Sequence, residues 1–129
     1  MAMRKPMNLN VLFADTYALI EFILESQAYE DFIHYDLVLT QFNLAELHYN
    51  LLRESGKEIA EYYFELYKNL AIAIPRSVLK IAMQFKLNYR HEKLSYADCI
   101  GYALAGHLGV PFLTGDQKFQ DKTNVIFVK

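Results

Sequence analysis

Four acidic residues of this chain stand where the surrounding sequence is apolar or where an apolar run ends. They are Asp15, Glu46, Asp98 and Asp116. Asp15 directly follows the run VLFA, and Asp116 directly follows PFLTG. Glu46 and Asp98 lie within the largely apolar segments NLAELHYNLL and SYADCIGYALAGHL. An acid in an apolar context is more informative than one in a charged stretch, because acids are rarely buried without a reason.

Four carboxylates brought close together would be suited to binding a metal ion. They repel one another strongly unless cations balance them or protons neutralise them. Hard divalent cations such as Mg²⁺ and Mn²⁺ favour oxygen ligands and keep several of their waters. Such a cation activates water and stabilises the charge of a phosphate under attack. If the four acids meet, the sequence favours metal-dependent hydrolysis of phosphodiester bonds.

Each acid also has an ordinary structural interpretation. Asp15 is in the position of a helix N-cap, and Asp116 is placed to cap a short turn. Asp98 follows Ser95 by three residues, which is the spacing of a capping box. Glu46 could be a solvated acid on the surface of its helix. These separate interpretations are less convincing if all four acids lie together at one site in the fold.

The apolar pattern predicts the elements that must position these acids. Unbroken apolar runs predict short buried strands over 10–14, 36–40, 71–74, from 109 onward, and over 124–128. Apolar residues at helical spacing predict helices over about 15–25, 42–54, 57–70, 77–88 and 95–107. This alternation predicts an α/β fold, with a central, mainly parallel sheet flanked by helices on both faces as a three-layer sandwich. Ligands of such sheets bind beyond the carboxyl ends of the strands, where Asp15 and Asp116 are expected.

The composition limits the class of protein. The 129 residues fit a single domain over 1–129, and a net charge of −2 excludes a general polyanion binder. A lone cysteine, Cys99, cannot form an internal disulfide, which indicates the cytoplasm. The four histidines are scattered, without the spacing of a zinc site. The apolar run that ends at Asp15 is too short to span a membrane, so no membrane association is predicted.

These motifs resemble those of the PIN domain family of nucleases, and in particular the VapC-type ribonuclease toxins of toxin–antitoxin modules. The most specific match is an acid in a helix, then a buried strand, then T-x-D-x-x-F. The resemblance covers nearly the whole chain. Its segments are 11-VLFADTYALIEFI-23, 43-NLAELHYNLL-52, 94-LSYADCIGYALAGHLGVPFLTGDQKF-119 and 124-NVIFV-128.

The resemblance implies a Mg²⁺- or Mn²⁺-dependent endoribonuclease that acts as the toxin of a type II toxin–antitoxin pair, with RNA as its substrate and a small antitoxin protein as its partner. It implies a catalytic site that holds one or two of these ions. The residues of that site are Asp15, Glu46, Asp98 and Asp116 as metal ligands, with Thr114 beside them. Glu54 and Glu58 are other acids near Glu46, and Thr16 is either a second site hydroxyl or an ordinary first residue of its helix.

Two further groups of residues have open roles. Lys93, Lys118 and Arg53 are candidates to contact RNA phosphates, or are plain solvated charges. The aromatic residues of 61-EYYFELYKNL-70 cover more than one helical face, so some belong to the core. The others are candidates for an interface with a second copy or an antitoxin and, after that, for stacking on bases. A homodimer is expected, with Tyr63 and Tyr67 as the candidates to test.

Two rival functions remain at this stage. The first is a non-catalytic member of the same fold that binds RNA or protein only, because a motif is not proof of turnover. The second is a receiver-like phosphoacceptor domain, which also has acids at parallel strand ends. A receiver usually needs a pair of acids after the first strand and a lysine after a late strand. Here Asp15 stands alone, and Lys118 lies beyond Asp116.

Overall fold

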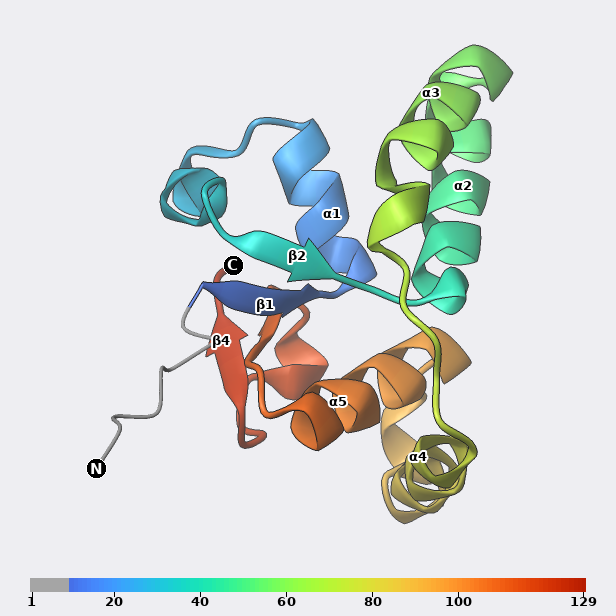
Figure 1. Ribbon diagram of the computed structural model, residues 1–129, viewed down its shortest axis with the longest axis vertical. Helices are drawn as coiled ribbons and strands as arrows, with labels where there is room; N and C mark the ends of the chain where they lie inside the picture. The colour runs from blue at the N-terminus through green and yellow to red at the C-terminus, as the bar shows by residue number, and fades with distance from the viewer. Residues whose placement is uncertain (1–9) are drawn as a thin grey trace, which may run out of the picture.

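The core of the fold is a sheet of four parallel strands. The computed structural model describes residues 10–129, and the first nine residues of the predicted domain lie outside that part. The strands are β1 (Val11–Ala14), β2 (Asp36–Val38), β3 (Phe112–Thr114) and β4 (Val125–Phe127), in the order β2-β1-β3-β4 (Figure 1). Because Ala14 pairs with Leu113, β1 and β3 end at the same edge of the sheet. Residues that follow these two strands are therefore neighbours.

Within residues 10–129, five α-helices connect and cover the strands. They are α1 (Thr16–Ile23), α2 (Gln41–Ser55), α3 (Lys57–Tyr67), α4 (Arg76–Asn88) and α5 (Tyr96–Leu108). Short 3-10 turns are η1 (Gln27–Phe32), η2 (Lys68–Leu70), η3 (Arg90–Glu92) and η4 (Gln117–Phe119). Gly56, with φ 91°, separates α2 from α3, and Gly109, with φ 70°, ends α5.

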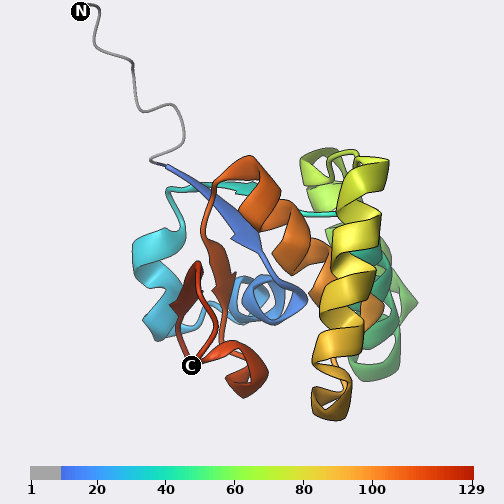
Figure 2. The ribbon, with the colours of Figure 1, turned by 90° about the horizontal axis from the view of Figure 1, so that it is seen from below.

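The alternation of side chains along the strands divides the interior into two cores. Leu12, Ala14 and Leu113 face α1, α2 and α3, whereas Phe13 and Phe112 face α4 and α5. Both faces of β1 and β3 are buried, which explains why their sequences are apolar without alternation. In Figure 1, α1, α2 and α3 lie above the sheet and α4 and α5 lie below it; Figure 2 shows the molecule from the α4 and α5 side. The predicted three-layer α/β sandwich is confirmed.

Two details of the predicted elements differ from the structure. The run 71–74 does not form a strand, and its only pairing in the described part of the chain is a single bridge between Leu39 and Ala71. The helix predicted over 57–70 ends as an α-helix at Tyr67 and continues as the 3-10 turn η2. Within residues 10–129, the helices are all too short or too polar to span a membrane.

Candidate active site

Asp15 is buried at the end of β1, with 2% of its surface exposed. Its backbone N–H donates to the Leu113 carbonyl at 3.1 Å, which fixes it beside β3. Its Oδ2 accepts a hydrogen bond from the Thr114 hydroxyl at 2.7 Å. The side chain makes no capping hydrogen bond to α1, so the N-cap interpretation does not describe what this carboxylate contacts. Its other oxygen, Oδ1, is buried without a hydrogen-bond partner among the described residues.

The surroundings of Asp15 favour its neutral form when no cation is present. Burial, then the negative charge of Asp98, and to a smaller extent that of Glu46, together raise the pKa of the Asp15 carboxyl to about 8. The hydrogen bond from Thr114 and the nearby backbone N–H of Thr16 limit this rise in pKa. The three acids are therefore close enough to influence one another, although they come from β1, α2 and α5.

Asp98 lies in the first turn of α5 and forms the capping box that its spacing predicts. Its Oδ2 accepts from the Ser95 backbone N–H at 2.9 Å, and the Ser95 hydroxyl accepts from the Asp98 N–H at 3.0 Å. These contacts use one carboxylate oxygen. Burial raises the pKa of the Asp98 carboxyl, and the charges of Glu46 and Asp116 raise it further. Asp98 is thus both a helix cap and part of the acidic group.

Glu46 lies one turn into α2 and is held by a polar network. The Thr16 hydroxyl donates to Glu46 Oε1 at 2.8 Å, and the Asn43 amide donates to the Thr16 hydroxyl at 3.2 Å. Asn43 is buried and forms a capping box with Thr40 at the start of α2. Thr16 therefore contacts a candidate site residue in addition to opening its helix. Sequence reasoning missed Thr40 and Asn43, although their three-residue spacing is that of a capping box.

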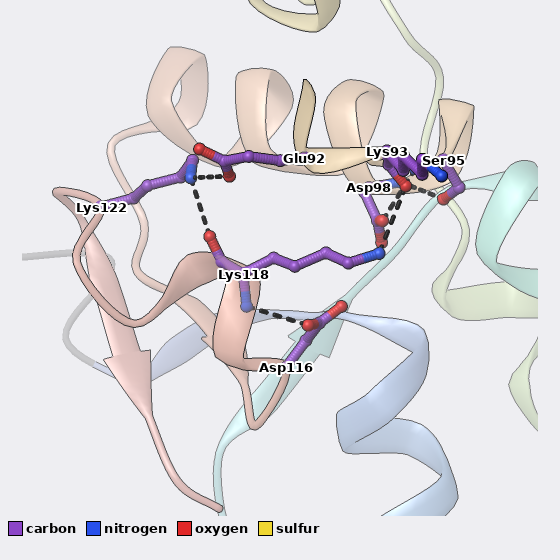
Figure 3. Close-up of polar contacts among 7 residues, drawn as sticks. All are labelled: Glu92, Lys93, Ser95, Asp98, Asp116, Lys118 and Lys122. Atoms are coloured by element: carbon purple, nitrogen blue, oxygen red, sulfur yellow. Dashed lines mark hydrogen bonds and ion pairs between the residues drawn. The ribbon is translucent and has the colours of Figure 1, made fainter. Parts of the chain in front are cut away.

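Asp116 lies in the turn that follows β3, half-buried. Its Oδ1 accepts from the Lys118 backbone N–H at 3.0 Å, so it caps η4 as its alternative interpretation predicts. Its own N–H donates to the Thr114 hydroxyl at 3.0 Å. Thr114 thus donates to Asp15 and accepts from Asp116, and it joins the two acids that follow β1 and β3. Figure 3 shows Asp98 and Asp116 on facing sides of one space, on α5 and beside η4.

The four predicted acids therefore gather at the carboxyl edge of the sheet, but not as a finished set of ligands. Within residues 10–129, no group of three or more Asp, Glu, His or Cys side chains is arranged to hold a metal ion. Two of the acids are turned toward backbone N–H groups that they cap. Two observations fit a hard divalent cation: the donors are all oxygens, and Asp15 Oδ1 is buried with no partner in the described part of the chain. Mg²⁺ commonly binds one or two carboxylates and fills the remaining positions with water.

The three basic residues considered as phosphate contacts, Lys93, Lys118 and Arg53, fall into two groups. The Lys118 ammonium donates to the Lys93 carbonyl at 3.3 Å, so these two residues meet beside the acids (Figure 3). Arg53 lies in the last turn of α2, where its guanidinium pairs with Glu54 at 2.9 Å and stands over the Tyr49 ring. Lys93 and Lys118 remain candidates for phosphate contact, and Arg53 has other partners.

The aromatic residues of α3 divide between the core and the surface. Tyr63 and Tyr67 are half-buried and pack against the core formed with α1 and α2. Tyr62 is 61% exposed, and its neighbour on the next turn, Leu66, is 54% exposed. Tyr63 and Tyr67 are therefore poor choices for testing an interface, because their loss would disturb the core first.

Comparisons with known proteins agree with this architecture. The family model described as PIN domain matches residues 12–125. Among solved structures, the chain is similar to one in a toxin–antitoxin complex from Klebsiella pneumoniae, with 14% identity, a TM-score of 0.68, and coverage of 89% of this chain and 95% of that one. It is also similar to a chain in the crystal structure of VapBC2 from Rickettsia felis bound to a DNA fragment from their promoter, with 12% identity, a TM-score of 0.67, and coverage of 91% and 96%. At these identities the structures show a shared fold. No curated protein matches the chain.

Proposed function

The chain belongs to the PIN domain family, and from this premise we propose that it is a Mg²⁺- or Mn²⁺-dependent endoribonuclease, the toxin of a type II toxin–antitoxin pair. The observation that carries the proposal is the setting of Asp15. Asp15 is buried beside Asp98 and Glu46, and its Oδ1 lacks a partner among residues 10–129, so its ionised form is costly unless a cation joins it. Binding of a cation would explain why the fold brings four acids together at one edge of the sheet.

Each side chain of the site has a stated task in this proposal. Asp15, Glu46, Asp98 and Asp116 hold the ion, which when bound supplies positive charge to polarise a phosphate and to make water more acidic. The Thr114 hydroxyl orients Asp15 through its 2.7 Å hydrogen bond. Thr16 orients Glu46, and Asn43 in turn orients Thr16. The carboxylate nearest the attacking water accepts its proton.

The substrate and the partners are proposed on the same premise. RNA is the proposed substrate. One of the two similar solved structures is a toxin–antitoxin complex, which supports an antitoxin as the partner of this chain. A homodimer and a cytoplasmic location complete the proposal.

The toxin assignment has its own test: expression of the chain should arrest bacterial growth, and expression of the Asp15→Asn variant should not. If cells that contain intact wild-type protein, at the same level as the Asp15→Asn variant, continue to grow, the toxin assignment is contradicted.

The first experiment is a calorimetric titration of the purified protein with Mn²⁺, beside the Asp98→Asn variant. Saturable binding by the wild type and its loss in the variant would support the site, and cleavage of single-stranded RNA with and without Mn²⁺ would follow. Asn keeps one side-chain oxygen, so the acceptor of the Ser95 cap survives while the charge is removed. RNA cleavage that persists in both Asp15→Asn and Asp98→Asn would contradict the assignment of these residues.

A second function is favoured by two observations. Asp98 and Asp116 are occupied as caps, and in residues 10–129 no ready-made set of metal ligands exists. Both features fit a non-catalytic PIN-fold module that binds RNA or protein. Absence of Mn²⁺ binding and of cleavage by a folded protein would favour that function. The receiver-like alternative is not retained, because the family match spans residues 12–125.

A further inference from the structure

Lysine and arginine are unevenly distributed along the chain, so the segments that form the site differ in the positive charge that they carry. Residues 6–52 contain no lysine or arginine. This segment supplies β1, α1, β2 and most of α2, and with them Asp15 and Glu46. The acids of the segment are Asp15, Glu21, Glu25, Glu30, Asp31, Asp36 and Glu46. A polyanion that approached the site over α1 would therefore meet no lysine or arginine from this segment.

The opposite side of the site carries two lysines. Lys93 precedes α5, Lys118 lies in η4, and both side chains are exposed. Neither ammonium forms an ion pair with an acid in the part of the chain that the structure describes. In Figure 3 the Lys118 side chain extends from η4 toward Lys93 and Asp98, and its ammonium donates to the Lys93 carbonyl at 3.3 Å. Positive charge is thus brought from two distant segments to one rim of the acidic site.

The backbone under these two lysines is tied together by a third lysine. Lys122 pairs with Glu92 at 2.6 Å and donates to the Lys118 carbonyl at 2.7 Å (Figure 3). Its side chain is only 10% exposed, and its ammonium lies 4.5 Å from the centre of the Tyr89 ring. Lys122 therefore holds the segment before α5 against η4 and has its charge satisfied. The exposed cations of this rim are Lys93 and Lys118.

A groove begins at this rim. It has a volume of about 460 Å³, which is within the range of pockets that hold small organic ligands. Its lining residues are Tyr89, Glu92, Gln117, Lys118, Asp121 and Lys122. Tyr89 is 39% exposed and offers an aromatic ring, and Gln117 offers an amide that can donate and accept hydrogen bonds. An unpaired base can use both kinds of group.

We propose that an RNA strand crosses the acidic site in one direction, leaving it over Lys93 and Lys118. These two ammonium groups bind the phosphates next to the one that is cleaved, and the following base enters the groove beside Tyr89. The inference rests on the proposed function and adds the path of the substrate to it. Its physical basis is that phosphates need nearby cations, and the chain supplies exposed ones on this side and none from residues 6–52.

The test is the salt dependence of RNA binding by the full chain. A fluorescent single-stranded RNA is titrated at several salt concentrations with the Asp15→Asn variant, which binds without cutting. Adding Lys93→Ala and Lys118→Ala should reduce the slope of log K against log salt by roughly 1.4, or about 0.7 for each phosphate that a lysine no longer neutralises. The matched control adds Lys57→Ala and Arg76→Ala, which change the net charge equally. Lys57 follows Gly56 at the tip of the α2–α3 hairpin, Arg76 is exposed at the start of α4, and this pair should leave the slope unchanged.

The outcomes separate this inference from the proposed function. An unchanged slope of log K against log salt in the variant that lacks Lys93 and Lys118 overturns the proposed path. An equal fall of the slope in that variant and in the control also overturns it, because the effect would then be a general one of charge. If wild-type protein nevertheless cleaves RNA in a metal-dependent way, the proposed function stands without the path. If the wild type does not cleave and the Asp15→Asn variant does not bind RNA, both fail. Restoration of the slope by Lys93→Arg and Lys118→Arg would support the path, because arginine retains the charge.

Discussion

Asp15 is the most deeply buried of the four candidate site acids. Its burial and its two acidic neighbours oppose ionisation, while Thr114 and the backbone of Thr16 favour it. A proton and a divalent cation are therefore alternative ways to neutralise the same carboxylate. This competition makes the state of the site depend on pH, and it can be followed through the stability of the protein without any RNA.

The first prediction is that metal-free protein loses stability as the pH rises from about 5 to about 8. The folded-state pKa of Asp15 is raised to about 8 from an ordinary value of 3.8, so between these values the folded state binds a proton that the unfolded state has released. Stability is then greatest near the lower value and falls until the pH passes the upper one. Thermal unfolding in a chelator measures the change. Asp15→Asn should remove most of it.

Mn²⁺ supplies the control for this prediction. Because the cation replaces the proton, added Mn²⁺ should raise the unfolding midpoint more at pH 8 than at pH 5, and less in Asp15→Asn at either pH. A wild-type midpoint that is constant across this range in chelator would contradict the raised pKa of Asp15. A gain from Mn²⁺ that is equal in wild type and Asp15→Asn would place the ion elsewhere.

The second prediction concerns the hydroxyl of Thr114, which joins Asp15 to Asp116. Thr114→Val keeps the shape of the buried side chain and removes the donor to Asp15, so it should destabilise the ionised site by about 1–3 kcal/mol. RNA cleavage should fall about ten-fold or more, and the pKa of Asp15 should rise further because a hydrogen bond that lowers it is removed. Thr114→Ser retains the hydroxyl and should keep most of the activity. Equal activities for Val and Ser would show that the hydroxyl has no role.

The types and order of the four acids could be read from the sequence, and so could the caps formed by Asp98 and Asp116. The contact between Thr16 and Glu46 could not, because it joins α1 to α2 across 30 residues of sequence. The same holds for Thr114 and Asp15, which are 99 residues apart. Local spacing predicts local hydrogen bonds, whereas a contact across the sheet depends on which strands are neighbours. The catalytic and metal-binding roles of these residues stay predictions.

At the scale of elements, the apolar pattern identified the five α-helices and the four sheet strands found in residues 10–129. The run 71–74 was predicted as a strand because short apolar runs look alike, but only Ala71 bridges to Leu39. Ile72 and Ile74 pack instead against the core beneath α4 and α5. The pairing β2-β1-β3-β4 did not follow from the sequence, since strand order is set by how helices cross the sheet.

The third prediction tests the turn between β3 and η4. Gly115 stands between Thr114 and Asp116, and a Cβ there would collide with the Tyr17 ring and the Val128 carbonyl. Gly115→Ala should therefore displace Asp116 and reduce both stability and Mn²⁺ affinity. The matched control is Gly106→Ala in α5, where a Cβ meets no atom within 4 Å and should stabilise the helix by about 0.5–1 kcal/mol. Calorimetry and thermal unfolding of both variants provide the comparison, and unchanged Mn²⁺ affinity in Gly115→Ala would contradict the prediction.

At the scale of the whole molecule, alternating strands and helices predicted the α/β sandwich because a strand buried on both faces must have helices on both sides. That the whole of 1–129 is one domain stays a prediction, as does the homodimer. Two exposed apolar faces are available for a second copy. Ile59, Tyr62 and Leu66 lie on α3, and Leu79, Met83 and Leu87 lie on α4.

Charge distinguishes these two faces. The surface around Tyr62 and Leu66 is bordered by glutamates, which would face their own copies across a two-fold axis and repel them; these residues are Glu58, Glu61 and Glu65. On α4, Leu79, Met83 and Leu87 are four residues apart, so they form one stripe along the helix. The hollow along this stripe is also lined by Lys80 and Gln84. The α4 stripe is thus the face better suited to pairing with itself.

The fourth prediction is that Met83→Glu converts the homodimer into a monomer, while Tyr62→Glu leaves it intact. Met83 is 38% exposed and Tyr62 is 61% exposed, so neither change should lower the unfolding midpoint of the monomer much. In a dimer built on the α4 stripe, two new glutamates would be buried near each other without cations, at a cost that the apolar contact cannot offset. Light scattering after size-exclusion chromatography gives the mass directly. A dimer that survives Met83→Glu would place the interface on another face, and a monomeric wild type would contradict the homodimer itself.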